Sequence, residues 1–187
     1  MIASFSLKNT IAVFGSSEPH PASAAYESAY RLGSLLARAR HPVLTGGYGG
    51  VMEAASRGAR EAGGTTIGVP CAIFGDRPPN PYLDEIVPAG DLYDRTRELI
   101  ERAAGYVVLP GKSGTLAELA MLWALDRCGC LNGRPVVLLG AGWQPLVDLL
   151  VRSNMLESSQ VDNTHVTDSP ERAVELLTTL LARSANE

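Results

Sequence analysis

The chain has 187 residues, enough for one compact domain with a substantial core. Hydrophobic residues make up 45% and charged residues 19% of the sequence, which excludes a disordered, collagen-like or coiled-coil chain. The 16 basic and 20 acidic residues give a net charge of −4, so the chain lacks the overall positive field of a module that binds a nucleic acid polymer.

The cysteines and the N-terminal segment indicate the cellular compartment of the protein. The spacing of Cys71, Cys128 and Cys130 predicts neither a disulfide framework nor a zinc site, and we expect reduced, partly buried thiols. The segment 1–17 carries no charged region ahead of its apolar residues, unlike a signal peptide. No apolar stretch approaches the roughly 18 residues that span a membrane. The sequence therefore predicts a cytoplasmic protein with no membrane partner.

Short β-branched runs alternate along the chain with longer segments of helical periodicity. The expected strands are 10–14, 43–45, 65–69, 85–87, 106–109 and 135–139. The expected helices are 22–40, 51–62, 92–104, 114–128, 143–152 and a last one that begins at Pro170 with Ser169 as its cap. Residues 70–83 contain four prolines and no clear period, which predicts a long loop.

This alternation predicts the fold class. Strands without polar alternation, separated by helices, are typical of an α/β fold with a doubly wound parallel sheet that helices cover on both faces. Without a linker or an internal repeat, we expect a single domain over residues 1–187. Ligands of such folds bind at the carboxyl ends of the strands, near a reversal of strand order. We therefore expect the site in the loops after the first, second and fifth strands.

Three of these loops are rich in small residues: 15–17 (GSS), 46–50 (GGYGG) and 111–115 (GKSGT). Glycine permits close backbone approach to a ligand, and the free N–H groups of a following helix attract phosphate. The pattern favours a phosphate or nucleotide site over glycines that only make tight turns. The dinucleotide motif G-x-G-x-x-G is absent after the first strand, and Walker A is excluded because Tyr106 stands where that motif requires its first glycine.

Two segments, TGGYGGVMEAASRGA and LPGKSGTLAELAMLWAL, resemble the Lonely Guy (LOG) family, whose signature is P-G-G-x-G-T-x-x-E. The signature corresponds to residues 110–118, and the segment 91–98 is similar to the family's acidic residue followed by Arg and Lys. The resemblance covers roughly residues 10–150. It departs from the family in a shorter second glycine loop, in Lys112 at the second glycine of the signature, and in Thr96 at the usual Lys.

The resemblance implies a Rossmann-like fold, a homodimer and a function. The implied reaction is hydrolysis of the N-glycosidic bond in a nucleoside 5′-monophosphate, AMP or an N6-modified AMP, to free base and ribose 5-phosphate. Arg95 and Glu118 are the implied catalytic residues. The residues expected to bind the nucleotide are Gly15, Ser16, Ser17, Gly46, Gly47, Gly49, Gly50, Met52, Gly111, Lys112, Ser113, Gly114 and Thr115.

The chemistry of this reaction fits the two implied catalytic residues. Cleavage passes through an oxocarbenium-like state, which needs a carboxylate near the anomeric carbon. Glu118 lies one turn into a helix whose N-terminus would hold the phosphate, and Arg95 could bind phosphate or steady the departing base. The alternatives are structural: Arg95 as an exposed charge paired with Asp91 or Glu98, and Glu118 as an acid that complements the helix dipole.

Other residues leave alternatives open. Lys112 could add a charge to the phosphate cradle or project away from it. For Glu53, a solvated helix position is favoured over contact with a ribose hydroxyl. An apolar stripe predicts core or a dimer interface; it comprises Leu116, Leu119, Ala120, Trp123 and Ala124.

Two other functions compete with this hypothesis. The fold and the glycine loops are also similar to those of molybdenum-cofactor carrier proteins. Such a carrier would hold a nucleotide or a phosphorylated cofactor without cleaving it. A lysine decarboxylase needs a Schiff-base lysine for pyridoxal phosphate, and neither Lys8 nor Lys112, the only lysines, has a supporting motif. The three histidines are far apart in sequence, so we expect no metal, and we expect no cofactor.

Overall fold

A computed structural model describes residues 9–184 of the chain. The N-terminal residues 1–8, which include Lys8 and the first part of the segment 1–17, lie outside the described residues. One sheet of parallel strands runs through the described part in the order β4-β3-β2-β1-β5-β6-β7. The strands are β1 (Ile11–Phe14), β2 (Val43–Thr45), β3 (Thr66–Gly68), β4 (Glu85–Ile86), β5 (Gly105–Val108), β6 (Val136–Leu139) and β7 (Thr164–Thr167).

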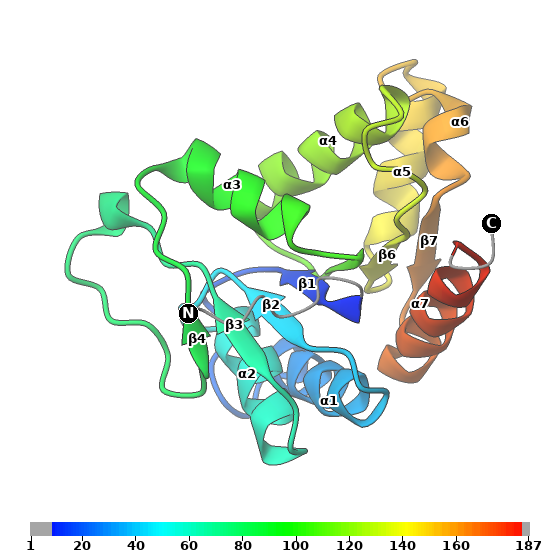
Figure 1. The fold of residues 1–187 in the computed structure, drawn as a ribbon. Helices are drawn as coiled ribbons and strands as arrows, with labels where there is room; N and C mark the ends of the chain where they lie inside the picture. Colours follow the sequence, from blue (N-terminus) through cyan, green and yellow to red (C-terminus); the bar gives the residue numbers. More distant parts are fainter. Residues whose placement is uncertain (1–8, 185–187) are drawn as a thin grey trace.

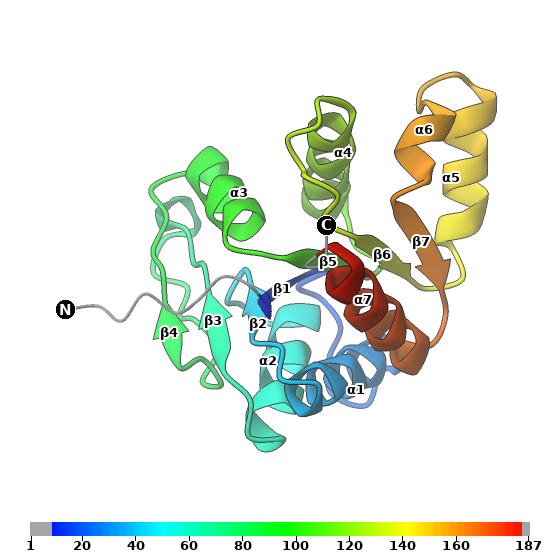
Figure 2. The ribbon, with the colours of Figure 1, turned by 45° about the vertical axis from the view of Figure 1, so that its right-hand side comes forward.

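Helices cover both faces of this sheet (Figures 1 and 2). One face carries α1 (Ala24–Arg38), α2 (Val51–Glu61) and α7 (Pro170–Ser184). The other face carries α3 (Leu92–Glu101), α4 (Ser113–Arg127), α5 (Trp143–Arg152) and the short α6 (Ser158–Val161). The predicted doubly wound parallel sheet, a Rossmann-like α/β fold, is therefore confirmed.

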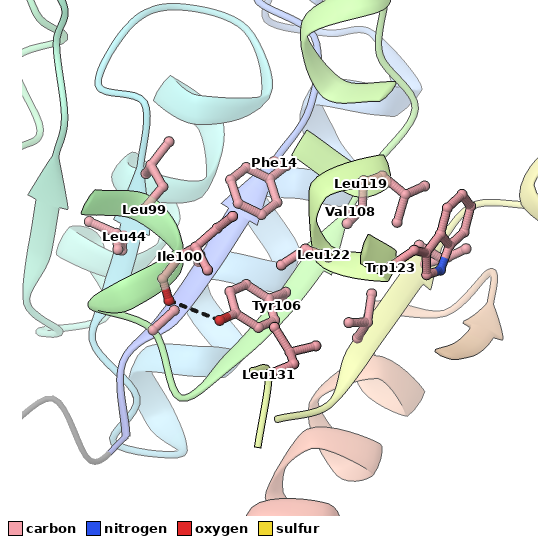
Figure 3. Close-up of a cluster of buried hydrophobic side chains, with 14 of the residues drawn as sticks. Phe14, Leu44, Leu99, Ile100, Tyr106, Val108, Leu119, Leu122, Trp123 and Leu131 are labelled. Atoms are coloured by element: carbon pink, nitrogen blue, oxygen red, sulfur yellow. Dashed lines mark hydrogen bonds between the residues drawn. The ribbon is translucent and has the colours of Figure 1, made fainter. Parts of the chain in front are cut away.

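The buried strands supply both layers of the core because successive side chains point to opposite faces. In β1, Ala12 and Phe14 face the α3–α4–α5 layer, while Ile11 and Val13 face the α1–α2–α7 layer. Figure 3 shows the first of these clusters, in which the Tyr106 hydroxyl donates a hydrogen bond of 2.9 Å to the carbonyl of Ile100. The core therefore holds α3 and α4, which carry Arg95 and Glu118, firmly against the sheet.

The strand order reverses between β1 and β5. From β1 the chain adds β2, β3 and β4 towards one edge, and from β5 it adds β6 and β7 towards the other. The connections that leave β1 and β5 therefore cross to opposite faces of the sheet (Figure 1), and the loops after these two strands line a crevice at the carboxyl ends of the strands. The glycine-rich loops 15–17 and 111–115 both begin at this crevice.

Most expected elements are present within one or two residues of their predicted ends, but α6 and β7 were missed. The sequence Thr-His-Val-Thr of β7 mixes polar and apolar residues because β7 is an edge strand whose side chains are only partly covered. The helix expected to reach residue 104 ends at Glu101, and Gly105 already belongs to β5. The loop 70–83 contains a turn of 3₁₀ helix, η2 (Ala72–Phe74).

The expectation of partly buried thiols holds for one cysteine. Cys71 is buried, whereas Cys128 and Cys130 are exposed because they lie in the turn that follows α4. All three are free thiols. Within residues 9–184, each helix is too short or too polar to cross a membrane.

Candidate active site

A cavity of about 190 Å³ lies at the crevice between β1 and β5. Its walls come from the loops after β1, β2 and β5, from α3 and α4, and from the loop 70–83. The predicted site residues that line it are Gly15, Ser16, Ser17, Gly46, Met52, Arg95, Lys112, Gly114, Thr115 and Glu118. The topology therefore brings together three loops that are far apart in the sequence.

The remaining predicted residues do not line this cavity; they are Gly47, Gly49, Gly50, Gly111 and Ser113. Two of these glycines make room for close packing, Gly50 between two loops and Gly111 within its own loop. A Cβ at Gly50, where φ is +68°, would lie 2.4 Å from the carbonyl oxygen of Ser16. A Cβ at Gly111 would lie 2.1 Å from Thr115 Oγ1. The structure thus gives Gly50 and Gly111 a packing role behind the residues that face the cavity.

Arg95 and Glu118 meet inside the cavity. Arg95 Nη1 lies 3.3 Å from Glu118 Oε1, and the two side chains are only 12% and 11% exposed. Arg95 Nε donates a hydrogen bond of 3.0 Å to the carbonyl of Val69, and Nη2 lies 3.8 Å from Met52 Sδ. Contacts with Val69, Met52 and Glu118 therefore hold the guanidinium in place, and its Nη1 faces the Glu118 carboxylate.

The purely structural roles considered for Arg95 and Glu118 are not the ones that the structure shows. The Asp91 carboxylate caps α3 by accepting hydrogen bonds of 2.8 Å from two N–H groups of its first turn. Glu98 pairs with Arg102, one turn further along α3. Arg95 therefore pairs with neither acid of its own helix. Glu118 lies in the second turn of α4 and is buried, so it is not a first-turn acid that complements the dipole.

The surroundings of Glu118 alter its protonation. Burial raises the pKa of Glu118 to about 7, against the opposing effect of the Arg95 charge. A carboxyl group with this pKa exists in both protonation states near neutral pH. It can therefore accept a proton from water or return one to a leaving group.

Lys112 points towards the cavity. Its ammonium forms an ion pair with Glu18, and both side chains line the cavity although they are 72% and 63% exposed. The pair links the loops after β1 and β5. Two other side chains lie off the cavity: Thr96, whose hydroxyl donates to the carbonyl of Leu92, and Glu53, which accepts a hydrogen bond of 3.0 Å from the Tyr26 hydroxyl.

Six residues of the cavity wall were not among the predicted site residues: Val13, Phe14, Glu18, Tyr48, Phe74 and Arg77. Tyr48 and Phe74 pack edge to face with ring centroids 5.5 Å apart, and the guanidinium of Arg77 lies 5.2 Å from the centroid of the Tyr48 ring. Tyr48 was hidden inside the glycine loop, and the loop 70–83 carries no period that would reveal which residues turn inward. Its length and its aromatic and cationic content were the available signals.

The described residues contain no group of three or more His, Cys, Asp or Glu side chains that could hold a metal ion. The predicted apolar stripe divides between two environments. Leu119 and Trp123 are core residues, and the Trp123 indole N–H donates to the Thr164 hydroxyl at 3.1 Å. Leu116, Ala120 and Ala124 are exposed on the outer side of α4.

Similar proteins carry two kinds of name. A "Probable cytokinin riboside 5′-monophosphate phosphoribohydrolase" of Oryza sativa subsp. japonica is 33% identical over 60% of this chain, and the match spans half of that relative's length. A "Cytokinin riboside 5′-monophosphate phosphoribohydrolase" of Mycobacterium marinum is 33% identical over 69% of this chain and 70% of the relative.

The second kind of name belongs to a protein of known structure. The molybdenum cofactor binding protein of Rippkaea orientalis is 27% identical and superposes with a TM-score of 0.74, covering 92% of this chain and 97% of that one. A model of the SLOG cluster4 family matches residues 8–174, which include every residue that lines the cavity. The chain belongs to the SLOG cluster4 family.

Proposed function

We propose that the protein hydrolyses the N-glycosidic bond of a nucleoside 5′-monophosphate, releasing the free base and ribose 5-phosphate. The buried pair of Arg95 and Glu118 carries this proposal, because it lies in one cavity with two loops suited to phosphate. The names of the relatives from rice and Mycobacterium marinum support the same reaction class. Measuring both products after incubation with nucleotide tests it.

The 5′-phosphate would lie at the loops after β1 and β5. Ser16 and Thr115 offer hydroxyl groups there, and the N-terminus of α4 offers free N–H groups and the positive end of its dipole. Lys112 adds a charge that now pairs with Glu18. Because Glu118 is one turn deeper in the same helix, a phosphate at the start of α4 places the ribose beside its carboxylate.

The proposed chemical step breaks the bond between C1′ of the ribose and the base nitrogen, whose electron pair leaves with the base. Glu118, as a carboxylate, stabilises the positive charge that develops at C1′ and takes the proton from the attacking water. The sugar gains the hydroxyl group, the departing base takes one proton from solvent, and Glu118 returns the proton it accepted to solvent. Arg95 holds the Glu118 carboxylate in position through the contact at Oε1.

The pH dependence follows from the environment of Glu118. Because the carboxylate form is the active one, kcat/KM should rise with pH through an apparent pKa near 7, the value that burial gives this group. Arg95→Met removes the charge that opposes this shift, so the rise should move to higher pH. Initial rates from pH 5 to 9 for both proteins test this. A flat profile, or a rise completed below pH 5, would contradict the role given to Glu118.

Lys112 is expected to bind the phosphate rather than to take part in the chemistry. Lys112→Met should raise KM for the nucleotide about tenfold and change kcat less than about threefold, since it removes a contact present in ground and transition states alike. Arg127→Met is the matched control, because Arg127 is an exposed cation at the opposite end of α4 that pairs with Glu157 off the cavity. An unchanged KM would show that Lys112 serves only its pair with Glu18.

A carrier that binds a phosphorylated cofactor without cleaving it is the second candidate. The likeness to the molybdenum cofactor binding protein of Rippkaea orientalis over 92% of the chain favours it. Mass spectrometry of the native purified protein separates the two candidates: a retained pterin or intact nucleotide supports carriage. Turnover with release of base supports the hydrolase.

Other expectations stay predictions. AMP or an N6-modified AMP as substrate comes from the resemblance and from the names of the relatives. A homodimer is proposed from the resemblance alone, and the exposed apolar side chains Leu116 and Met121 on α4 offer a surface for a second copy. The cytoplasmic location is proposed from the cysteine pattern and the N-terminal segment.

A further inference from the structure

One wall of the cavity is formed by aromatic rings and guanidinium groups, unlike the glycine-rich loops proposed to hold the phosphate. A series of contacts leads along it from Glu118 to Arg95, from Arg95 to the Phe74 ring at 5.9 Å, from Phe74 to Tyr48, and from Tyr48 to Arg77. All five residues line the cavity. Arg77 and Glu118 are therefore the two ends of this series of contacts.

The side chains of Arg95 and Tyr48 in this wall already have protein partners. Arg95 is bound by Val69, Glu118 and Met52. The Tyr48 hydroxyl donates to the carbonyl of Cys71 at 3.1 Å and accepts from the N–H of Cys71 at 2.9 Å. Among the described residues, Arg77 has no hydrogen-bond or ion-pair partner, and its guanidinium lies over the Tyr48 ring. Its guanidinium thus offers free donors to whatever enters the cavity.

The segment that carries Phe74 and Arg77 is tied down at both ends. At one end Cys71 is held by Tyr48 and forms a bridge with Ala89. At the other end Asn80 donates to the carbonyl of Tyr48 at 3.1 Å through its side chain and to the carbonyl of Gly47 at 2.8 Å through its backbone. Phe74 nevertheless keeps 44% of its surface exposed. The wall therefore presents an aromatic ring and a free guanidinium from an anchored position.

From these contacts we infer that the loop 70–83 binds the base and selects a 6-oxopurine, so that the preferred ligand is inosine or guanosine 5′-monophosphate. This rests on the proposed function, which puts the phosphate at the other loops and the ribose at Glu118. Phe74 stacks on the purine ring, and Arg77 donates two hydrogen bonds to O6 and N7, both of which are acceptors. Adenine offers N7 alone and turns an amino donor towards the guanidinium.

An N6-alkylated adenine fits this wall still less well. Its alkyl chain would lie against the charged guanidinium, and the side chains Tyr48, Phe74 and Arg77 leave no free acceptor for the N6–H group. The inference therefore points away from AMP and its N6-modified forms, although these are the substrates that the family resemblance implies.

Titration calorimetry on Glu118→Gln protein, in which turnover is blocked, tests the selection with IMP, GMP, AMP, N6-isopentenyl-AMP and ribose 5-phosphate. We expect IMP and GMP to bind about tenfold tighter than AMP. Arg77→Met in this background should abolish that ratio and leave ribose 5-phosphate unaffected. Phe74→Ala should weaken all the purine nucleotides about tenfold and keep the ratio. Arg97→Met, which removes an exposed cation of α3 that pairs with Asp94, is the control.

Equal or tighter binding of AMP would overturn the inference, as would a 6-oxopurine preference that survives Arg77→Met. The ratio of kcat/KM for IMP and AMP, measured with wild-type and Arg77→Met protein, is a second measurement that does not depend on the Glu118 variant. Failure of the proposed function has a different result: no base is released from any nucleotide, while the Arg77-dependent preference in binding persists.

Discussion

Replacing Glu118 with Gln is expected to reduce turnover about 1,000-fold and to leave the Kd for the nucleotide within about threefold. Gln has the shape of Glu, and its Oε1 can still accept the hydrogen bond from Arg95. It supplies no negative charge for C1′ and takes no proton from water. The loss should therefore fall on kcat, with the fold and the phosphate contacts preserved.

This prediction separates chemistry from folding. Initial rates of base release give kcat, calorimetry gives Kd, and thermal unfolding shows that the variant is folded. Glu101→Gln is the matched control, since it removes an exposed carboxyl at the end of α3 that does not line the cavity. A Glu118→Gln protein with wild-type kcat would show that another group performs the step.

Gly58→Ala is expected to lower the free energy of unfolding by about 3 kcal/mol, and Gly33→Ala by a similar amount. A Cβ at Gly58 would lie 2.0 Å from the carbonyl oxygen of Tyr30, and a Cβ at Gly33 would lie 2.0 Å from that of Ala55. Both obstacles are backbone atoms, so α1 and α2 must move apart. The gain in helix propensity from Gly to Ala, about 1 kcal/mol, is too small to offset this.

Denaturant unfolding of these variants measures the loss. Gly142→Ala is the control, because a Cβ there meets no atom within 4 Å and its φ of −74° suits alanine. Activity should fall with stability, since α2 begins at the glycine loop and carries Met52 into the cavity. Unchanged stability in both α1–α2 variants would mean that these helices do not pack as closely as described.

The sequence was informative where one physical cause dominates. The unbroken apolar runs of β1, β5 and β6 predicted a parallel sheet because strands buried on both faces have no polar alternation. Since parallel strands end at the same edge of a sheet, the loops 15–17 and 111–115 were expected near one another, and they are. The family resemblance selected Arg95 through the segment 91–98 and Glu118 through the signature; the two pair in the cavity, and their catalytic roles stay a proposal.

What the sequence did not predict depends on tertiary packing. The loop 70–83 has no period, so its sequence alone could not indicate that Phe74 and Arg77 turn towards Tyr48. The same holds for Gly111, expected at the ligand, whose missing side chain instead makes room for Thr115. The edge strand β7 was not predicted because an edge position permits polar residues, which weaken the sequence pattern of a strand.

The most direct test of the proposed reaction is product analysis after incubating the folded wild-type protein with AMP, GMP and IMP. The account predicts free base and ribose 5-phosphate in equal amounts, formed in proportion to enzyme and time, and absent with Glu118→Gln. Recovery of every nucleotide intact, from protein whose thermal unfolding shows a folded state, would contradict the hydrolase and favour a carrier.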